Sequence, residues 1–290
     1  MWPKKRTIAR ILGSSYRSLS PLRRLPIKAT IYISRIFVKL LGNAAKSLCY
    51  AVYFVSPKLR FQLKSSGDKN LRLAKYTTIP RILWQTNFTN RVTLPVYLNY
   101  LFNCLMSQNF EYRFVITDER RQFVLKYYPG RIFDAYSRIQ IGAAQADFWR
   151  ILVLQKYGGV YMDIDAHLVW PLERILKPEQ EELFLQIKTG EISNYFIASK
   201  PNNPHLSAII DQIVENIEND STENVYDLTG PGVFNKVLGG LSVPRRYYLY
   251  TCNQGNFTNE YFQYLDKPQG KWTKEQTKTA VLSPKPGARH

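Results

Sequence analysis

Acidic residues are almost missing from the first quarter of this 290-residue chain. Residues 1–75 hold seventeen Lys and Arg but a single acid, Asp68. That segment therefore carries +16 of the formal net charge of +18, which leaves +2 for the other 215 residues. Nucleic-acid binding normally shows as a basic face on a folded domain, and a nearly neutral main domain does not predict one. We expect no nucleic-acid partner and a local anionic partner for the basic segment.

Cysteine and histidine are also scarce. Cys49, Cys104 and Cys252 are far apart and form no Cys-x-x-Cys pair, so the sequence predicts neither a disulfide framework nor a zinc site. A reducing compartment fits this usage. Of the three histidines, His167 is the one close to a group of acids. With 45% hydrophobic and 14% aromatic residues, the chain has ample material for a buried core, which excludes a wholly disordered protein.

The chain has no uninterrupted apolar run of about 20 residues, the length that a membrane-spanning helix needs. Arginines interrupt the N-terminus repeatedly, so a cleaved secretory signal is not expected. The segment from Ile27 to Val55 is apolar, but basic residues recur in it at steps of seven, four and seven. This spacing places them on one side of a helix. The basic residues are Lys28, Arg35, Lys39 and Lys46.

Apolar residues such as Phe37, Leu41 and Leu48 lie opposite that basic stripe. Two interpretations follow: an amphipathic helix in a membrane interface, or an ordinary helix packed on the main domain. We expect residues 1–75 to be a basic amphipathic segment and linker that binds an anionic membrane surface through residues 1–70, and residues 76–290 to be the main domain. Asn-x-Ser/Thr triplets allow a Golgi membrane, but we expect the cytoplasmic face of a bacterial inner membrane.

Beyond residue 75, strand-like and helix-like stretches alternate, which is typical of an α/β domain. Gly158 follows a strongly apolar helical stretch and is well placed to end it in a left-handed cap. The predicted strands are residues 79–85, 112–117 and 160–166, and the predicted helices are residues 94–108, 120–128 and 143–157.

Two acids stand in the last of these strands. Because the side-chain period of a strand is two, Asp163 and Asp165 are expected on the same face. Like charges so close repel each other unless a cation sits beside them. Carboxylates suit Mg²⁺ or Mn²⁺, which commonly leave coordination positions for substrate phosphates. A bare Asp-x-Asp also recurs by chance as a solvated strand end, so its context decides.

That context is the preceding helix. Asp147 and Arg150 are three residues apart and share a helical face, where alone they would form a weak surface ion pair. The helix runs through Gly158 and Gly159 directly into the diacid strand. We therefore expect its polar face in the same cleft, where one guanidinium and three acids suit a hydroxyl-rich, phosphate-bearing ligand.

The run from Asp147 to Asp165, DFWRILVLQKYGGVYMDID, closely resembles the DXD sugar-binding region of glycosyltransferase family 32. That family includes yeast and bacterial mannosyl- and hexosyltransferases and is similar to the catalytic domain of the clostridial glucosylating toxins. Residues 79–85, IPRILWQ, and residues 229–232, TGPG, are similar to further family segments. The resemblance covers residues 76–240.

The resemblance implies a glycosyltransferase A fold, a Rossmann-like α/β domain that binds a nucleotide sugar, here with the basic helix as an N-terminal extension. It also implies a divalent metal, Mn²⁺ or Mg²⁺, and retention at the anomeric carbon. The enzyme would be a hexosyltransferase, a class that includes mannosyltransferases. Its acceptor would be a glycan or a lipid-linked glycan, as in lipopolysaccharide or capsule synthesis.

The resemblance also assigns roles by matched position. Asp165 would bind the metal, and Asp163 would contact the metal, its water or the donor. Asp147 and Arg150 would hold hydroxyls of the donor sugar. Trp84 would lie near the nucleotide base, with a core aromatic at a strand end as the alternative.

The C-terminal part departs from the family pattern. Lys271 stands where a Ser is common before Trp272, and no His lies just upstream, so a metal ligand from this region is in doubt. Residues 229–231 either cap a helix, with Pro in its first turn, or shape the acceptor side. Two rival functions stay open: a catalytically silent membrane-bound scaffold, and a metal-dependent phosphotransferase or nuclease.

Overall fold

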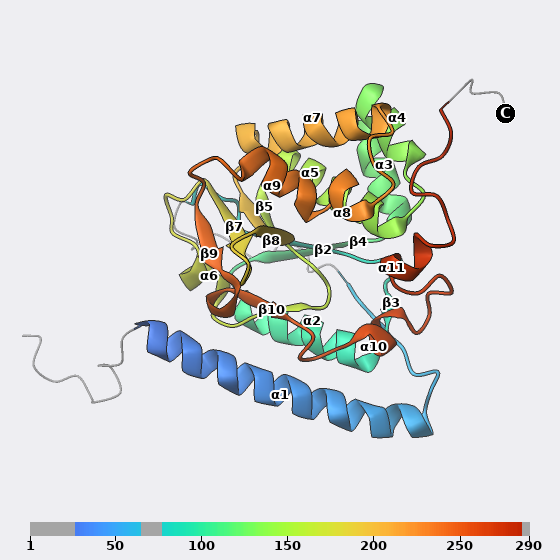
Figure 1. Cartoon of the computed structure of the whole chain (residues 1–290). Helices are drawn as coiled ribbons and strands as arrows, with labels where there is room; N and C mark the ends of the chain where they lie inside the picture. The colour runs from blue at the N-terminus through green and yellow to red at the C-terminus, as the bar shows by residue number, and fades with distance from the viewer. Residues whose placement is uncertain (1–26, 65–76, 286–290) are drawn as a thin grey trace, which may run out of the picture.

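A six-stranded mixed sheet forms the centre of the computed structural model, which describes residues 27–64 and 77–285 (Figure 1). The strand order is β4-β2-β5-β8-β7-β9, and β8 is the strand that runs against its neighbours β5 and β7. Parallel β4, β2 and β5 bring their carboxyl ends to one edge, where ligands bind in α/β sheets. The strands are β2 (Ile82–Thr86), β4 (Glu111–Val115), β5 (Gly159–Met162), β7 (Glu182–Gln186), β8 (Ile192–Ser199) and β9 (Arg245–Tyr247).

Helices cover both faces of this sheet, which confirms the α/β class. Helices α3, α4, α5, α7, α8 and α9 lie on one side, and α2 lies on the other with α1 outside it (Figure 1). The longer helices are α1 (Ile27–Val55), α2 (Leu94–Met106), α3 (Thr117–Tyr127), α4 (Arg131–Arg138), α5 (Gly142–Tyr157), α7 (Pro204–Glu218) and α9 (Pro231–Leu238). The short ones are α6 (Leu172–Ile175), α8 (Val225–Leu228), η3 (Tyr248–Tyr250), α10 (Glu260–Tyr264) and α11 (Trp272–Glu275).

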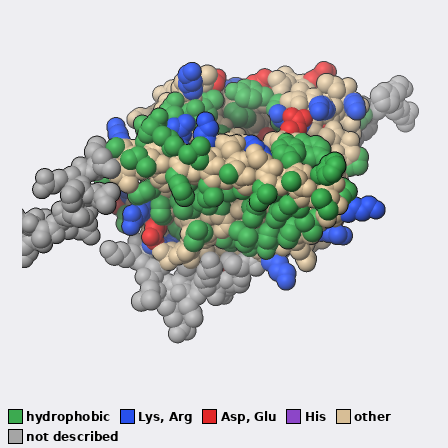
Figure 2. Space-filling view, turned by 90° about the horizontal axis from the view of Figure 1, so that it is seen from below, with side chains coloured by type: hydrophobic (Ala, Val, Ile, Leu, Met, Phe, Trp, Pro, Cys, Tyr) green, Lys and Arg blue, Asp and Glu red, His purple; other side chains and the backbone are tan. Residues whose placement is uncertain are grey.

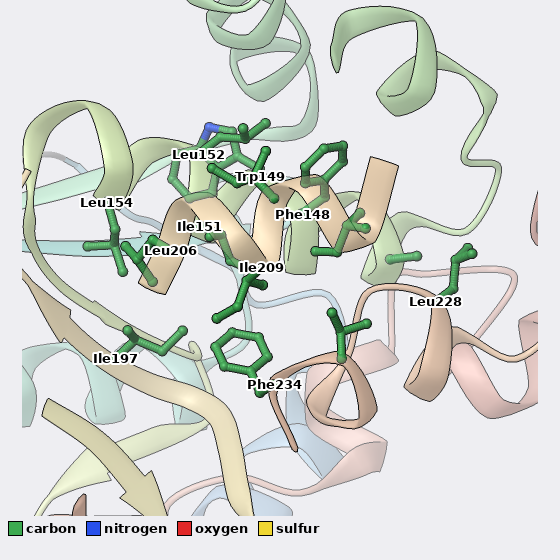
Figure 3. Packing of buried hydrophobic residues seen from close by; sticks show 14 of the residues in the cluster. Phe148, Trp149, Ile151, Leu152, Leu154, Ile197, Leu206, Ile209, Leu228 and Phe234 are labelled. Atoms are coloured by element: carbon green, nitrogen blue, oxygen red, sulfur yellow. The ribbon is translucent and has the colours of Figure 1, made fainter. Parts of the chain in front are cut away.

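Helix α5 is the central helix of the layer that α3, α4, α5, α7, α8 and α9 form on one face of the sheet. It is apolar nearly all round, and a helix of that kind is stable only when buried. Phe148, Trp149 and Leu152 are each at most 1% exposed, and they belong to one buried cluster with residues of α7 and α9 (Figure 3). Their burial fixes the polar N-terminal half of the same helix relative to the sheet.

The Gly158-Gly159 pair between α5 and β5 has a steric cause. Both glycines have positive φ, +66° and +105°, which other L-residues rarely adopt. A Cβ on Gly158 would come within 2.8 Å of Pro80 and Pro201, and one on Gly159 would lie 2.7 Å from the carbonyl of Ile82. Only glycine lets α5 turn this closely into β5, so the helix ends at Gly158 as predicted, although its ψ of −165° is not that of a left-handed cap.

The predicted strand 160–166 is shorter in the structure, and this corrects the placing of both acids on one strand. Strand β5 ends at Met162, and a turn follows before the short β6 (Ala166–Leu168), which pairs with β10 (Cys252–Gln254). The amide of Asp163 still donates to the carbonyl of Tyr195 of β8, and the amide of Ala166 closes the turn by donating to the carbonyl of Asp163. The acids lie just beyond the strand, at the carboxyl edge of the sheet.

Helix α1 spans the same residues as the predicted amphipathic segment, and it packs on the main domain. Ile31, Val38 and Cys49 are buried, and Tyr53 contacts Phe262 of α10. Strand β1 (Phe61–Gln62) pairs with β3 (Arg91–Val92). The predicted boundary near residue 75 falls outside the described residues. Within those residues, no helix is both long and apolar enough to cross a bilayer.

Candidate active site

A cavity of about 700 Å³ opens at the carboxyl edge of the sheet. The end of β2, the starts of α3 and α5, the turn after β5 and the start of β8 form its inner wall. Segments from residue 254 to residue 272 form the opposite wall. Pockets at this position of an open α/β sheet are the usual ligand sites. Four predicted residues line it: Asp147, Arg150, Asp163 and Asp165.

Arg150 connects its helix partner Asp147 with Asp163, one of the two acids that follow β5. Its Nη2 lies 2.8 Å from Asp147 Oδ1 and 3.1 Å from Asp163 Oδ1, and its Nη1 donates to the carbonyl of Asn194 at 2.7 Å. The guanidinium also stacks over the Tyr161 ring, 4.3 Å from its centroid. Only 5% of Arg150 is exposed. Five donors in a planar fork are thus fixed by several partners, unlike an exposed ion pair.

The two other acids of the cleft have strongly shifted pKa values. Burial raises the pKa of Asp147 to about 7, and the charge of Asp163 adds to the shift, although Arg150 opposes it. Burial also raises the pKa of Asp165 to about 7, again with a contribution from Asp163. Perturbed carboxyl groups in a cleft are typical of functional sites, because binding a cation or a hydroxyl there relieves the cost of burying charge.

The acids fit a hard divalent cation by their chemistry. Asp163 and Asp165 are brought together by the turn, and the side-chain amide of Gln254 lies against both, at 3.5 and 3.0 Å. Among residues 27–64 and 77–285 there is no group of three or more His, Cys, Asp or Glu with a metal-binding arrangement. Two carboxylates supplemented by neutral oxygens and substrate phosphates form a set that suits Mg²⁺ or Mn²⁺.

Trp84 lies in the core on β2, which is the alternative to a position near the nucleotide base. Its side chain is 4% exposed, donates to the carbonyl of Gly158 at 3.0 Å and packs against Trp149 and Tyr157. It is not among the residues that line the cavity. Phe88, two residues beyond β2, does line it. Trp84 is therefore a core aromatic, and Phe88 is an aromatic side chain near the end of this strand that faces the cavity.

Other lining residues had no local signal in the sequence. Asn194 of β8 donates to Asp147 Oδ1 at 3.0 Å, a contact across 47 residues. Arg120 of α3 is 2% exposed, donates to Thr117 and forms no ion pair within the described part of the chain. It stands in the charged run DERRQ, a pattern that predicts a solvent-exposed helix face.

The segment 229–232 has features of both interpretations. Pro231 is the first residue of α9 and Gly230 is its N-cap, so a cap is present at Gly230 and not at Thr229. Gly230 and Pro231 also line the cavity. His167 lies behind the site on β6, 1% exposed, with Nε2 3.1 Å from Asn256 Nδ2.

Comparison with known proteins agrees with this site. Residues 95–182 match the family described as "Glycosyltransferase sugar-binding region containing DXD motif". This region includes α5, the Gly-Gly turn and both acids. The resemblance seen in the sequence is confirmed, and the protein is a glycosyltransferase.

Individual relatives are distant. An uncharacterized glycosyltransferase of Acanthamoeba polyphaga mimivirus is 29% identical over 199 residues, which cover 62% of this chain and 76% of that protein. Toxin Afp18 of Yersinia ruckeri serotype O1 is 34% identical over 101 residues, 33% of this chain and 5% of the toxin. Among solved structures, the PaToxG glycosyltransferase is 17% identical, with a TM-score of 0.46 over 73% of this chain and 79% of that one.

Proposed function

We propose that this protein transfers a hexose from a nucleotide sugar to a glycan or lipid-linked glycan acceptor, with a divalent cation at Asp163 and Asp165 and with retention at the anomeric carbon. The observation that carries the proposal is the ion-paired group in the cleft of the DXD region, in which buried Asp147 and Arg150 meet the half-buried Asp163. These charges are costly to bury unless a ligand uses them.

Each residue has a chemical task in this proposal. Asp163 and Asp165 would hold the cation, whose positive charge would stabilise the negative charge of a leaving nucleoside diphosphate. Arg150 orients the donor sugar because its guanidinium is fixed by Asp147, Asp163 and Asn194 before any ligand binds. Asp147 accepts a hydrogen bond from a sugar hydroxyl, and a pKa of about 7 lets it hold or release a proton near neutral pH.

A screen of radiolabelled nucleotide sugars with Mn²⁺ tests the proposed reaction. We expect slow, metal-dependent hydrolysis of one donor without acceptor, because every proposed donor contact comes from this chain. Release of nucleoside monophosphate or of inorganic phosphate would identify a phosphotransferase instead. Binding of a nucleotide sugar without turnover, with and without added glycans, would identify a silent scaffold.

We further propose that the outer face of α1 lies on an anionic membrane. Large apolar side chains on this face are exposed, among them Phe37 at 64%, Leu40 at 65% and Leu48 at 68%. They form an extended apolar area when the molecule is viewed from below, with basic side chains around it (Figure 2). Apolar patches this long on a monomer are unusual and mark interaction surfaces.

The basic residues of α1 decide the kind of partner. Lys28 and Lys39 are exposed at the border of the apolar face, where ammonium groups can reach lipid headgroups. Lys46 is engaged in the protein, since its Nζ donates to the carbonyl of Gly255. An apolar stripe bordered by exposed cations matches an anionic bilayer better than a second copy of the same cationic surface.

Flotation of full-length protein with anionic and with neutral liposomes tests this placement, at low and at high salt. We expect flotation with anionic liposomes that is reduced, but not abolished, by salt, because salt screens the cations and spares the apolar face. Protein that stays in the aqueous fraction, with a dimeric mass by light scattering, would assign the face to a second copy instead.

A further inference from the structure

The segment from Gln254 to Asn259 connects the acids of the cleft to helix α1. At one end, the Gln254 amide nitrogen lies 3.0 Å from Asp165 Oδ1 and 3.5 Å from Asp163 Oδ2. The amide therefore occupies the place where both carboxylates converge. It is the neutral side chain in contact with both acids, and it comes from the opposite wall of the cleft.

A side-chain amide can serve a cation as well as a carboxylate. Rotating the amide of Gln254 by half a turn exchanges its nitrogen for its oxygen, which changes the group facing the acids from donor to hard oxygen ligand. No third His, Cys, Asp or Glu joins the two acids in a metal-binding group within the described ranges. Gln254 is thus the side chain best placed to complete the set.

Helix α1 holds the backbone beside Gln254. Lys46 Nζ donates to the carbonyl of Gly255 at 2.7 Å, directly after Gln254 in the chain. Farther along, the amide of Asn259 donates to the hydroxyl of Tyr50. These contacts join residues more than 200 positions apart, and they fix the segment from its outer side.

The close approach of helix and segment depends on Gly42. This residue is buried in α1, and a Cβ there would lie 3.0 Å from Phe257 and 3.1 Å from Asn256. Distances this short require the neighbours to move. On the inner side, Asn256 contacts His167, so a displaced segment has little room to shift without disturbing β6.

We propose that Gln254 is the third protein ligand of the cation held by Asp163 and Asp165, and that α1 positions it through Gly42 and Lys46. The proposal rests on the cation binding in the proposed function. It makes the inner face of α1 part of the active-site wall, and it supplies the C-terminal ligand that the sequence pattern did not reveal.

A Mn²⁺ titration of the full-length protein without nucleotide tests whether Gln254 is a ligand. Binding is measured as the decrease of the electron paramagnetic resonance signal of free Mn²⁺. Gln254→Ala should weaken binding by about tenfold, and Gln254→Glu should strengthen it, because a third carboxylate adds charge to the set. Gln263→Ala is the matched control, since Gln263 lines the same cleft but, unlike Gln254, its side chain donates no hydrogen bond to either acid. Unchanged affinity in both Gln254 variants would overturn the ligand assignment.

A second pair of variants tests the role of α1. Lys46→Met should weaken Mn²⁺ binding with little change in melting temperature. Gly42→Ala should also weaken Mn²⁺ binding, but with a lower melting temperature, because its Cβ would press on Asn256 and Phe257. Lys39→Met is the control because Lys39 is exposed on the same helix. Equal Mn²⁺ affinity in the Lys46 and Lys39 variants would show that α1 does not position Gln254.

The outcomes separate this inference from the proposed function. Wild-type protein that binds no Mn²⁺ would remove the metal from both. Protein in which Asp165→Asn abolishes Mn²⁺ binding while every Gln254 variant binds normally would keep the proposed function and reject Gln254 as a ligand.

Discussion

The cleft and the outer face of α1 break the usual rule of burial in opposite ways. In the cleft, Arg120 is 2% exposed and forms no ion pair among the described residues, although charged side chains are rarely buried without close pairing. On α1, Phe37 is 64% and Phe54 is 90% exposed, although large apolar side chains are normally covered. Each exception costs stability, so each indicates a surface that is completed by something outside the chain.

The two surfaces differ in how they should respond to substitution. Residues in the cleft are held by directional contacts to a few partners, so a single change should remove activity and leave the fold intact. The face of α1 is a broad area of similar side chains, so single changes should matter little there and effects should accumulate. The following predictions test that contrast.

The largest effect is expected from Asp165→Asn. The substitution removes one charge of the cation site and keeps the shape of the side chain, so kcat/KM should fall by about 10³-fold. The melting temperature should stay the same or rise, because the repulsion from Asp163 that helps raise the pKa of Asp165 is removed. Steady-state donor hydrolysis and thermal unfolding measure both.

Asp211→Asn on the exposed side of α7 is the control for this change. Transfer at the wild-type rate in the Asp165 variant would refute the assignment of this acid to the cation.

Arg150→Lys should lower kcat/KM by about 10²-fold. A lysine keeps the charge but cannot hold Asp147, Asp163 and the Asn194 carbonyl at once, because it lacks the planar fork. The loss should appear mainly in kcat if Arg150 orients the sugar for reaction. Near-normal kinetics in the lysine variant would reduce Arg150 to a structural ion-pair partner.

On α1, the double change Phe37→Ser and Leu40→Ser should weaken liposome binding by at least about tenfold, because two inserted apolar side chains are lost. Donor hydrolysis and melting temperature should not change, since both side chains point away from the domain. Val38→Ser is the contrasting variant: Val38 is 3% exposed, so its change should lower stability by about 1–3 kcal/mol. Similar behaviour of the two variants would contradict the division of α1 into an inner and an outer face.

Much of this comparison could be predicted from the sequence. The basic stripe at helical spacing predicted α1 from Ile27 to Val55, and the apolar run ending at Gly158 predicted α5 within one residue. Both signals are local, because helical periodicity and a glycine helix end depend on neighbouring residues. The acids were found for the same reason, since they lie a few residues beyond that glycine.

The rest depended on contacts between distant segments. After Asp163 the chain turns away from β8 and pairs with β10 through β6, and nothing in the Asp-Ile-Asp triplet distinguishes it from a strand. Asn194 and Gln254 reach the acids from other strands. The inner face of α1 was also hidden, because apolar residues that pack on a domain and apolar residues that face lipid share one periodicity.

The last prediction concerns the dependence of stability on pH, measured by denaturant unfolding without cation. Burial lowers the pKa of His167 to about 4, below its ordinary value of about 6.5. The folded state therefore binds fewer protons at His167 than the unfolded state between these values, and the contribution of this group to the free energy of unfolding should fall as pH falls from 6.5 toward 4. The total loss from this group is on the order of 3 kcal/mol.

The cleft acids act in the opposite direction. Because the folded-state pKa values of Asp147 and Asp165 are raised to about 7, the folded state binds extra protons below pH 7, and stability should rise as pH falls from 7 toward 4. His167→Gln removes the loss of stability from His167 and keeps the gain from Asp147 and Asp165. The stability of this variant relative to wild type should therefore increase steadily as pH falls. Asp165→Asn removes the part of the gain that comes from Asp165, so the stability of this variant relative to wild type should decrease as pH falls. Parallel pH profiles for wild type and both variants would mean that neither group is held in its buried environment as the structure places it.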